Sequence, residues 1–588
     1  MTKKQAEAFT YKGEQFYLGG KPFTVRSGAI HYFRVPLPYW RDRLLKLKEC
    51  GFNTVETYVA WNLHEPREGE FDFSGEKDVA AFLRTAQELG LYAIVRPGPF
   101  ICAEWEAGGF PAWLLSDRNM RLRCSDTKYI QKVERYFARL FALLRPCAIE
   151  NGGNVILWQV ENEYGSYGND KAYLQRLVEI YRGNGITGQL FTADGDWINM
   201  LVKGLLPESC LPALTFGSRT EQAMHSLDNL VKNTPKMCAE FWCGWFDHWG
   251  EEHHTRTSED VLKDLEPFFA NDWSFNFYMF HGGTNFGFMN GANSGEKYMP
   301  IVTSYDYCGL LTEAGDRTQT YYKVRDLFIK YGVQVPELSA RESKKAAYGK
   351  VQLTRRAYLF EQLNAIAKPT EAPYPPYMEE VGQNYGYILY STVVPKGLEE
   401  DRLVLDGVAD RALVYLDGEK IATVDRNAPM PNVLIDTENK EKRLEILVEN
   451  RGRINYGKDI YDRKGISAVR HGDATLFGYT IYALKMKSLS ELTYSAMAEK
   501  TDKPVFCTAT FTIDGEPCDT FVELEGVRRG FVMINGFNIG RFNYDEGPQK
   551  TLYVPAPYLN KGENRLVIFS SDGARAKVSA IFLSVPRL

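Results

Sequence analysis

The sequence lacks several features that identify common classes of protein. No apolar run is long enough to cross a bilayer, so we expect no membrane span. The 70 basic and 75 acidic side chains are intermixed, with a net charge of −5, and form no basic stripe of the kind that nucleic acid requires. The ten cysteines are scattered and include no CxxC pair, so we expect reduced thiols. These absences argue against a membrane protein, a nucleic-acid-binding protein and a disulfide scaffold.

The first residues also lack a recognisable targeting signal. The string MTKKQAEAFTYKGEQF contains lysines, but neither an apolar core nor a small-residue cleavage site follows it. We therefore expect no secretory signal and a cytoplasmic location.

Metal and cofactor motifs are missing as well. The acidic residues and histidines near position 250 lack the HExxH pattern and any strict ligand spacing, and we expect them to form a solvated loop. These residues are Asp247, His248, Glu251, Glu252, His253 and His254. GGTNFG, at 282–287, lacks the Lys-Ser/Thr of a phosphate loop, so its glycines are expected to permit close backbone approach. The sequence predicts no metal and no cofactor.

Aromatic residues, by contrast, are abundant. The 35 Tyr, 34 Phe and 10 Trp make up 13% of the 588 residues. Sugar rings have flat C–H faces that pack on aromatic rings, so one interpretation is a carbohydrate ligand; the other is aromatic-rich β structure. The length exceeds what one hydrophobic core supports, and we expect two to four domains.

Up to about residue 335, short apolar runs alternate with amphipathic helical segments. The segment PYWRDRLLKLKECG places Trp40, Leu44, Leu47 and Cys50 on one helical face and ends at Gly51. Eight β-rich runs indicate a closed (β/α)₈ barrel, in which catalytic groups gather at the C-terminal ends of the strands. The eight runs are PFTVRSGAIHYF, TVETYVAW, LYAIVRPGPF, NVILWQVENEYG, QLFTADGDW, PALTFGS, KMCAEFWCGW and WSFNFYMFHGG.

Beyond residue 335 the pattern changes to short alternating strands separated by turn signals such as Asp417-Gly418 and Asn535-Gly536. The string KPTEAPYPPYM contains four prolines and is expected to be irregular. We expect a (β/α)₈ TIM barrel followed by two all-β sandwiches of the jelly-roll or galactose-binding type. The predicted boundaries are 1–335 for the barrel, 336–395 for a linker leading into the β region, 396–488 for the first sandwich and 489–588 for the second.

A weak internal sequence repeat supports two related sandwiches. ALVYLDGEKIATV followed by KRLEILVENRG resembles GFVMINGFNIGRF followed by ENRLVIFSSDG in pattern and order. The alternative is that any two hairpins of this composition look alike.

Two strand ends carry carboxylates suited to glycosidic chemistry. Hydrolysis with retention needs two carboxyl groups about 5–5.5 Å apart, one protonated and one ionised. In WQVENEYG, alternation along the strand predicts that Glu161 and Glu163 share one face. Glu240 follows an apolar run among aromatic residues, an unfavourable place for a carboxylate that is neither paired nor functional. A structural salt bridge is the alternative role for either strand-end carboxylate.

Five strings in the chain resemble, in order and spacing, the signature blocks of glycoside hydrolase family 35. They are TYVAWNLHEP, RPGPFICAEWEAGGFPAWLL, WQVENEYGSYG, CAEFWCGWFDHWG and TSYDY. The resemblance implies a compact, signal-less β-galactosidase with Glu163 as acid/base and Glu240 as nucleophile. It also implies that five further residues surround the galactose. These are Tyr58, Ala103, Glu104, Asn162 and Tyr307. On chemical grounds we expect Tyr307 to hydrogen-bond the nucleophile and Tyr58 to bind a sugar hydroxyl.

Further aromatic residues are candidates for the part of the substrate beyond galactose. Trp242 and Trp245 lie just after Glu240, and Tyr456 lies in the string GRINYGK. Packing between barrel and sandwich is the alternative role for all three. Cys102, beside Glu104, is expected to be a small packing residue that lines the sugar site.

The expected substrates are galactoside oligosaccharides or glycoconjugate glycans, with a preference for β-1,3 linkages implied by the resemblance alone. Two other functions stay open: a noncatalytic, lectin-like receptor, and an exo-glycosidase or transglycosylase with another sugar preference, such as a β-glucosaminidase. Neither nucleic acid nor a membrane is an expected partner, and a homodimer is left open.

Overall fold

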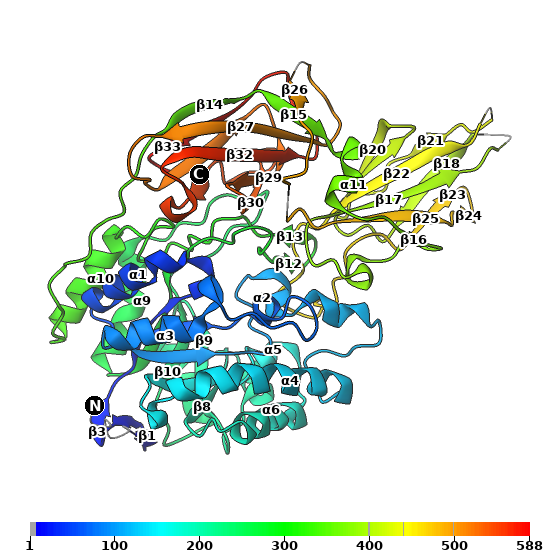
Figure 1. Ribbon diagram of the computed structural model, residues 1–588. Helices are drawn as coiled ribbons and strands as arrows, with labels where there is room; N and C mark the ends of the chain where they lie inside the picture. Colours follow the sequence, from blue (N-terminus) through cyan, green and yellow to red (C-terminus); the bar gives the residue numbers. More distant parts are fainter. Residues whose placement is uncertain (1–7, 398–399, 439, 488, 498, 588) are drawn as a thin grey trace.

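The computed structural model describes residues 8–397, 400–438, 440–487, 489–497 and 499–587, and Figure 1 shows a barrel with two β-sandwiches side by side above it. Eight parallel strands close the barrel in the order β10-β11-β4-β5-β6-β7-β8-β9. Each of the eight expected strands is present. Their bounds are β4 (Arg26–Ile30), β5 (Thr54–Tyr58), β6 (Tyr92–Arg96), β7 (Val155–Gln159), β8 (Gln189–Gly195), β9 (Leu211–Phe216), β10 (Met237–Trp242) and β11 (Ser274–His281).

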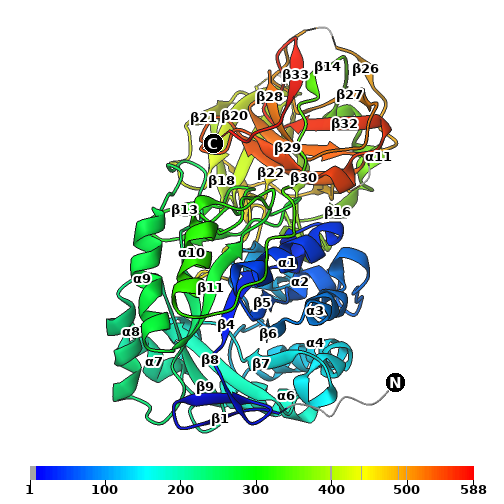
Figure 2. The same ribbon diagram turned by 90° about the vertical axis from the view of Figure 1, so that its left-hand side faces the viewer.

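Helices surround this barrel, and Figure 2 shows them on both sides of the strands. The longer ones are α1 (Trp40–Cys50), α3 (Val79–Glu88), α4 (Thr127–Leu144), α6 (Lys171–Gly183), α7 (Ile198–Gly204), α8 (Thr220–Ser226), α9 (Ser258–Ala270) and α10 (Gln319–Lys330). Three short helices are α2 (Trp61–His64), α5 (Tyr164–Tyr167) and α11 (Leu363–Ile366). The predicted apolar face of α1, from Trp40 to Cys50, is buried, and the helix is capped by Gly51, whose φ of 120° favours glycine.

A small N-terminal sheet, which the sequence analysis did not predict, covers the other end of the barrel. It consists of β1 (Phe9–Lys12), β2 (Gln15–Leu18) and β3 (Lys21–Phe23). Phe9 and Phe16 pack in one cluster with residues of the barrel strands, among them Ile156, Phe191 and Met237. This apolar layer seals the barrel opposite the C-terminal ends of its strands.

The first sandwich has a six-stranded and a four-stranded sheet, ordered β16-β25-β17-β22-β19-β20 and β21-β18-β23-β24. The bounds of the first sheet are β16 (Thr370–Ala372), β25 (Tyr479–Leu484), β17 (Tyr387–Val394), β22 (Lys442–Glu449), β19 (Arg411–Leu416) and β20 (Glu419–Asp425). Those of the second are β21 (Val433–Ile435), β18 (Asp401–Asp406), β23 (Ala468–His471) and β24 (Ala474–Thr475). The expectation that KPTEAPYPPYM is irregular is therefore wrong for 370–372. Pro369 and Pro373 flank this strand, at a sheet edge where a missing N–H is tolerated.

The second sandwich is ordered β14-β33-β28-β31 and β26-β15-β27-β32-β29-β30. The bounds of the first sheet are β14 (Gly349–Leu353), β33 (Val578–Leu583), β28 (Thr520–Glu525) and β31 (Leu552–Val554). Those of the second are β26 (Ser495–Ala496), β15 (Arg355–Tyr358), β27 (Val505–Ile513), β32 (Gly562–Ser570), β29 (Arg529–Ile534) and β30 (Phe537–Asn543). Strands β14 and β15, drawn green among orange strands in Figure 1, thus precede the first sandwich in sequence but belong to the second. Both lie within the predicted linker, 336–395.

The sequence repeat corresponds to a shared strand arrangement. The orders β17-β22-β19-β20 and β27-β32-β29-β30 are equivalent, and each hairpin has one register shift, with the extra residue, Ile421 or Ile539, in its second strand. Asp417-Gly418 and Asn535-Gly536 form the two hairpin turns, with positive φ at all four residues. The two sandwiches are therefore alike in topology at this point.

Candidate active site

All eleven residues that the sequence predicts for the site line one cavity at the C-terminal ends of the barrel strands. Its volume is about 160 Å³. The predicted residues are Tyr58, Cys102, Ala103, Glu104, Asn162, Glu163, Glu240, Trp242, Trp245, Tyr307 and Tyr456. Three residues that the sequence analysis did not propose complete the lining: Phe246, Tyr278 and Asn293. Residues nearly 400 positions apart in the chain therefore meet in one place.

Glu240, on β10, accepts hydrogen bonds at both carboxylate oxygens. Oε1 lies 2.6 Å from Arg96 Nη2 and 2.6 Å from the hydroxyl of Tyr58. Oε2 accepts from the indole Nε1 of Trp242 at 2.9 Å. The side chain is only 8% exposed, so protein groups rather than water contact its carboxylate oxygens.

Arg96, the last residue of β6, is the most important site residue that the sequence analysis missed. It is fully buried, its guanidinium lies 4.1 Å from the centre of the Tyr58 ring, and Nη2 also donates to Asn162 Oδ1 at 2.7 Å. Acidic neighbours, Glu240 among them, help to raise its pKa although burial lowers it. A charged residue at the end of the apolar run YAIVR was the available signal.

The loop after β7 separates two glutamates that the alternation rule placed on one face. Strand β7 ends at Gln159, and both Glu161 and Glu163 have positive φ, 62° and 45°, so the strand periodicity no longer applies. Both Glu161 oxygens bind the buried Arg123, at 2.9 and 2.8 Å. The prediction of a shared face is therefore wrong: Glu161 makes a structural ion pair, and Glu163 alone lines the cavity.

Glu163 has fewer hydrogen-bond donors than Glu240. The hydroxyl of Thr215, on β9, donates to its Oε1 at 2.7 Å. Burial and, after it, the negative charge of Glu240 raise the pKa of Glu163 to about 7, while Thr215 and Arg96 oppose the shift. Near neutrality Glu163 therefore carries its proton for a large part of the time.

The segment 102–104 presents Glu104 through an unusual backbone. Cys102, Ala103 and Glu104 have φ of 54°, 53° and 50°, a left-handed conformation that costs each non-glycine residue about 1–2 kcal/mol. Buried Arg34 donates to the carbonyl of Ala103, and Tyr305 donates to Glu104 Oε2. Burial raises the pKa of Glu104 to about 7. These contacts hold the carboxyl at the cavity wall.

The contact expected between Tyr307 and the nucleophile is made by another tyrosine. Within the described residues, Tyr58 donates to Glu240, whereas the ring of Tyr307 packs against Tyr278 and Tyr305, with both pairs of centroids 5.4 Å apart. The reason is topological, since Tyr58 ends a barrel strand and Tyr307 lies in a covering loop.

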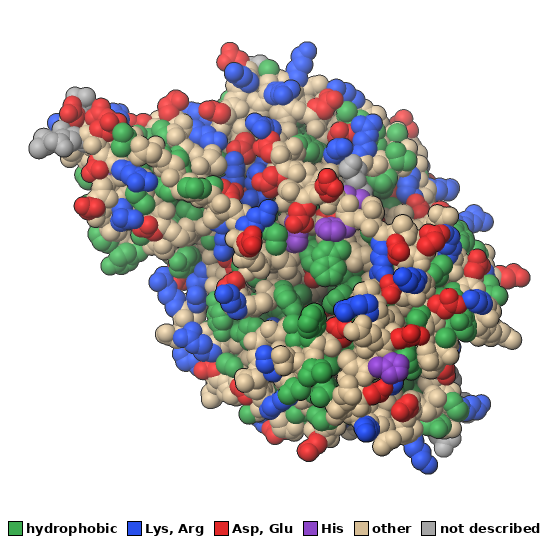
Figure 3. Space-filling model, turned by 180° about the vertical axis from the view of Figure 1, so that it is seen from behind, with side chains coloured by type: hydrophobic (Ala, Val, Ile, Leu, Met, Phe, Trp, Pro, Cys, Tyr) green, Lys and Arg blue, Asp and Glu red, His purple; other side chains and the backbone are tan. Residues whose placement is uncertain are grey.

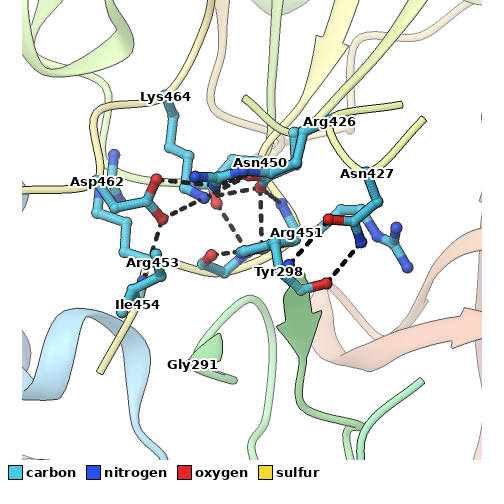
Figure 4. A network of polar contacts seen from close by, with 12 residues as sticks. Gly291, Tyr298, Arg426, Asn427, Asn450, Arg451, Arg453, Ile454, Asp462 and Lys464 are labelled. Atoms are coloured by element: carbon cyan, nitrogen blue, oxygen red, sulfur yellow. Dashed lines mark hydrogen bonds and ion pairs between the residues drawn. The ribbon is translucent and has the colours of Figure 1, made fainter. Parts of the chain in front are cut away.

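The first sandwich contributes a loop to the cavity, and Figure 4 shows the polar network that anchors it. Lys464 binds Asp410 and Asp462 at 2.7 Å each, all three being buried, and Tyr298 donates to the carbonyl of Gly452 at 2.6 Å. Between these anchors, Asn455 and Tyr456 reach the site. Asn455 Nδ2 lies 3.4 Å from Cys102 Sγ, and Tyr456 lines the cavity.

The glycines of GGTNFG permit the expected close approach. A Cβ on Gly282 would lie 1.6 Å from the carbonyl oxygen of Tyr305, and one on Gly283 would lie 2.5 Å from that of Arg34. The two glycines therefore let this backbone pack closely against the loop that holds Tyr305 and against the turn that holds Arg34.

The acidic residues and histidines near position 250 pair with one another. His253 and His254 both contact the carboxylate of Asp247, at 2.7 and 2.9 Å, and His248 contacts Glu251 at 2.6 Å. In the described ranges no group of three His, Cys, Asp or Glu side chains has a geometry suited to a metal ion. The helices of these ranges include none long and apolar enough to cross a membrane.

Comparison with known proteins agrees with the resemblance seen in the sequence. The family model "Glycosyl hydrolases family 35" matches residues 15–331, and the models "Beta-galactosidase, first all-beta domain" and "Beta-galactosidase, galactose-binding domain" match 375–485 and 504–564. The chain is 41% identical to human beta-galactosidase-1-like protein 2 over 96% of its length and 89% of the relative's. It is 39% identical to the beta-galactosidase of Xanthomonas manihotis, over 94% and 92% of the two chains, and to that of Mus musculus, over 93% and 89%.

Proposed function

This chain belongs to glycosyl hydrolase family 35 and is a glycoside hydrolase, and from this premise we propose that it removes terminal β-D-galactose with retention of configuration. The observation that carries the proposal is the contrast between Glu163 and Glu240 in one cavity. One carboxylate accepts hydrogen bonds from three donors, and the other carboxyl has a raised pKa. Retaining hydrolysis requires such a pair.

In the proposed first step, a carboxylate oxygen of Glu240 attacks the anomeric carbon as the bond to the leaving oxygen breaks. Glu163 transfers its proton to that oxygen. The products are a glycosyl ester on Glu240, an ionised Glu163 and the released alcohol. Once Glu240 is esterified its negative charge is gone, so the pKa of Glu163 falls and Glu163 accepts a proton from the attacking water. The second displacement restores both carboxyls.

The cavity supports an exo mode of action. Its volume, about 160 Å³, is well below the roughly 300–1,000 Å³ of sites for larger ligands, which suits a single monosaccharide. Asn162 Oδ1 lies within hydrogen-bond distance of Arg96, Gln159 and Tyr58, which directs Nδ2 away from these three donors and favours donation to the sugar 2-hydroxyl. Glu104 is proposed to bind further hydroxyls.

Galactose as the sugar is inferred from the relatives, which are named beta-galactosidases. The proposed substrates are galactoside oligosaccharides and glycoconjugate glycans. A preference for β-1,3 linkages is the finer part of the proposal. A hydrolysis panel of β-1,3, β-1,4 and β-1,6 galactosides, with the first product anomer followed by NMR, tests both points. Release of β-galactose, fastest from the β-1,3 substrate, is expected; first release of α-galactose would rule out retention.

Replacing the two glutamates tests their roles separately. Glu240→Gly is expected to abolish activity on an aryl β-galactoside, and added azide should restore turnover with an α-galactosyl azide as product. Recovery of the β-azide would contradict the assignment of Glu240. Glu163→Ala should fail most severely with poor leaving groups, because activated aryl groups need no proton. An equal loss across leaving groups would contradict the assignment of Glu163 as the acid.

A further inference from the structure

A second, larger hollow opens directly beside the cavity. Its volume is about 610 Å³, and it shares four lining residues with the cavity: Glu163, Trp242, Trp245 and Tyr456. The rest of its wall comes from β8 and β9, from the loops and helices that follow β8, β9 and β10, and from Ser166 of α5. Figure 3 shows hydrophobic side chains gathered around a hollow in the face of the molecule opposite to that of Figure 1. We name the 610 Å³ hollow the outer groove.

Trp197 forms an aromatic wall of the outer groove that no step of the proposed reaction uses. It lies just after β8, at the start of α7, and its side chain is 68% exposed, more than any other large hydrophobic residue described. No ring contact or hydrogen bond of its indole is found in the described part of the chain. Trp242 and Trp245, with ring centroids 5.6 Å apart, also line the groove.

Polar groups accompany these aromatic surfaces. Asp196 and Arg219 face each other at 3.6 Å, and Arg219 is more than half exposed. Arg256 is fixed by Asp264 at 2.7 Å and donates to the carbonyl of Trp242 at 2.7 Å. Exposed indole faces with carboxylate and guanidinium groups at their edge suit a sugar ring, which offers a C–H face and peripheral hydroxyls.

The position of the outer groove identifies its occupant. Glu163 must contact the oxygen that links galactose to the leaving group, so that group departs on the side of Glu163, which the groove shares. We propose that the outer groove binds sugars on the leaving-group side of a galactose-terminated oligosaccharide, and that Trp197 is the stacking surface for a sugar beyond the first. This inference rests on the proposed function. It makes oligosaccharides of three or more sugars the preferred substrate class.

Trp197→Ala tests the proposal when kcat/KM is measured for an aryl β-galactoside, a β-galactosyl disaccharide and a β-galactosyl trisaccharide. The trisaccharide is expected to lose about five- to tenfold, as for loss of one aromatic stacking contact. The aryl galactoside should stay within about twofold, which also shows that the variant folds. Trp197→Phe should recover part of the loss. Val202→Ala is the matched control, because Val202 is on the same helix and 54% exposed but does not line the groove.

Two results would overturn the outer groove as a sugar site. One is an unchanged trisaccharide rate in Trp197→Ala. The other is an equal loss for all three substrates, which would indicate a structural role. Failure of the proposed function itself is distinguishable, because the unmodified enzyme would then leave the aryl β-galactoside intact.

Discussion

The loop that follows β7 and the strand β10 each hold a glutamate, but in two different environments. Glu240 has a buried guanidinium, a phenol and an indole as donors, whereas Glu163 has the hydroxyl of Thr215. Glu240 is buried and Glu163 is partly buried. The two carboxyls therefore differ in the number and charge of their donors. In the proposed mechanism they act as nucleophile and acid in one cavity.

Among the variants considered, removing the charged donor of Glu240 should reduce activity the most. Arg96→Gln is expected to lower kcat/KM for an aryl β-galactoside about 10²–10³-fold, as for breaking a buried ion pair. Arg96→Lys keeps the charge and should lose less. Thermal unfolding and circular dichroism check that both variants fold. A loss below tenfold in a folded Arg96→Gln would show that the ion pair between Arg96 and Glu240 is not needed for activity.

Tyr58→Phe removes a neutral donor from the same carboxylate. A hydrogen bond to a charged group contributes about 1.5–3 kcal/mol, so a decrease of about 10- to 100-fold in kcat/KM is expected. Tyr278→Phe is a suitable control, because Tyr278 lines the same cavity but its hydroxyl contacts Tyr305 at 3.2 Å. Equal losses in the two variants would argue against a specific role for the Tyr58 hydroxyl.

Thr215→Val removes the hydrogen bond to Glu163, the other carboxyl of the pair. The Thr215 hydroxyl stabilises the ionised form of Glu163, so its removal should raise the pKa of Glu163. Activity that depends on a protonated Glu163 is lost as the pH rises through that pKa, about 7 in the unmodified protein, and the alkaline limb of kcat/KM should therefore move to higher pH. The rate at low pH should change less than about tenfold.

Thr192→Val provides the matched control for that experiment. Thr192 is a buried threonine of β8 whose hydroxyl has no partner in the described residues. The pH dependence of kcat/KM in Thr192→Val should be the same as in the unmodified protein. An unchanged alkaline limb in Thr215→Val, or an equal shift in both variants, would contradict the hydrogen-bond explanation.

The smallest effect is expected for Glu56, a third buried carboxyl, which lies on β5. It lies inside the barrel with Oε1 3.7 Å from Arg96 Nη1, and burial raises its pKa to about 8. Because the folded pKa is raised, this group stabilises the fold at low pH, and that contribution is lost as the pH rises through about 8. Glu56→Gln cannot titrate. The difference in Tm between Glu56→Gln and the unmodified protein should shift in favour of the variant between pH 5 and 8.

Differential scanning calorimetry at several pH values measures that difference. The ionic strength must be held constant across the series. A difference in Tm that does not depend on pH would show that Glu56 does not titrate in this range.

Much of the architecture could be predicted because it depends on local patterns. The eight barrel strands are apolar runs bounded by turn signals, and the duplicated hairpins have Asp-Gly and Asn-Gly turns. The pairing of β15 with β27 could not be predicted, because Arg355 and Thr508 are brought together across the whole first sandwich. No short-range pattern records such a contact.

The same distinction holds for the site. Glu163 and Glu240 were predictable as strand-end carboxylates within recognisable motifs, and all eleven proposed residues line the cavity. The hydrogen-bond donors to these glutamates could not be predicted. Arg96 and Thr215 lie on other strands, and only closure of the barrel brings them to the two glutamates. The alternation rule failed at Glu161 because the backbone leaves the strand at Gln159.

The most direct test of the contrast is to trap the enzyme with 2-deoxy-2-fluoro-β-D-galactosyl fluoride and map the label by tandem mass spectrometry. The fluorine slows the second displacement, so the covalent ester accumulates. We expect one galactosyl group per chain, attached to Glu240, in the peptide that contains MCAEFWCGW. A label on Glu163 or Glu104, or turnover of natural substrate by a protein that never forms the ester, would contradict the account.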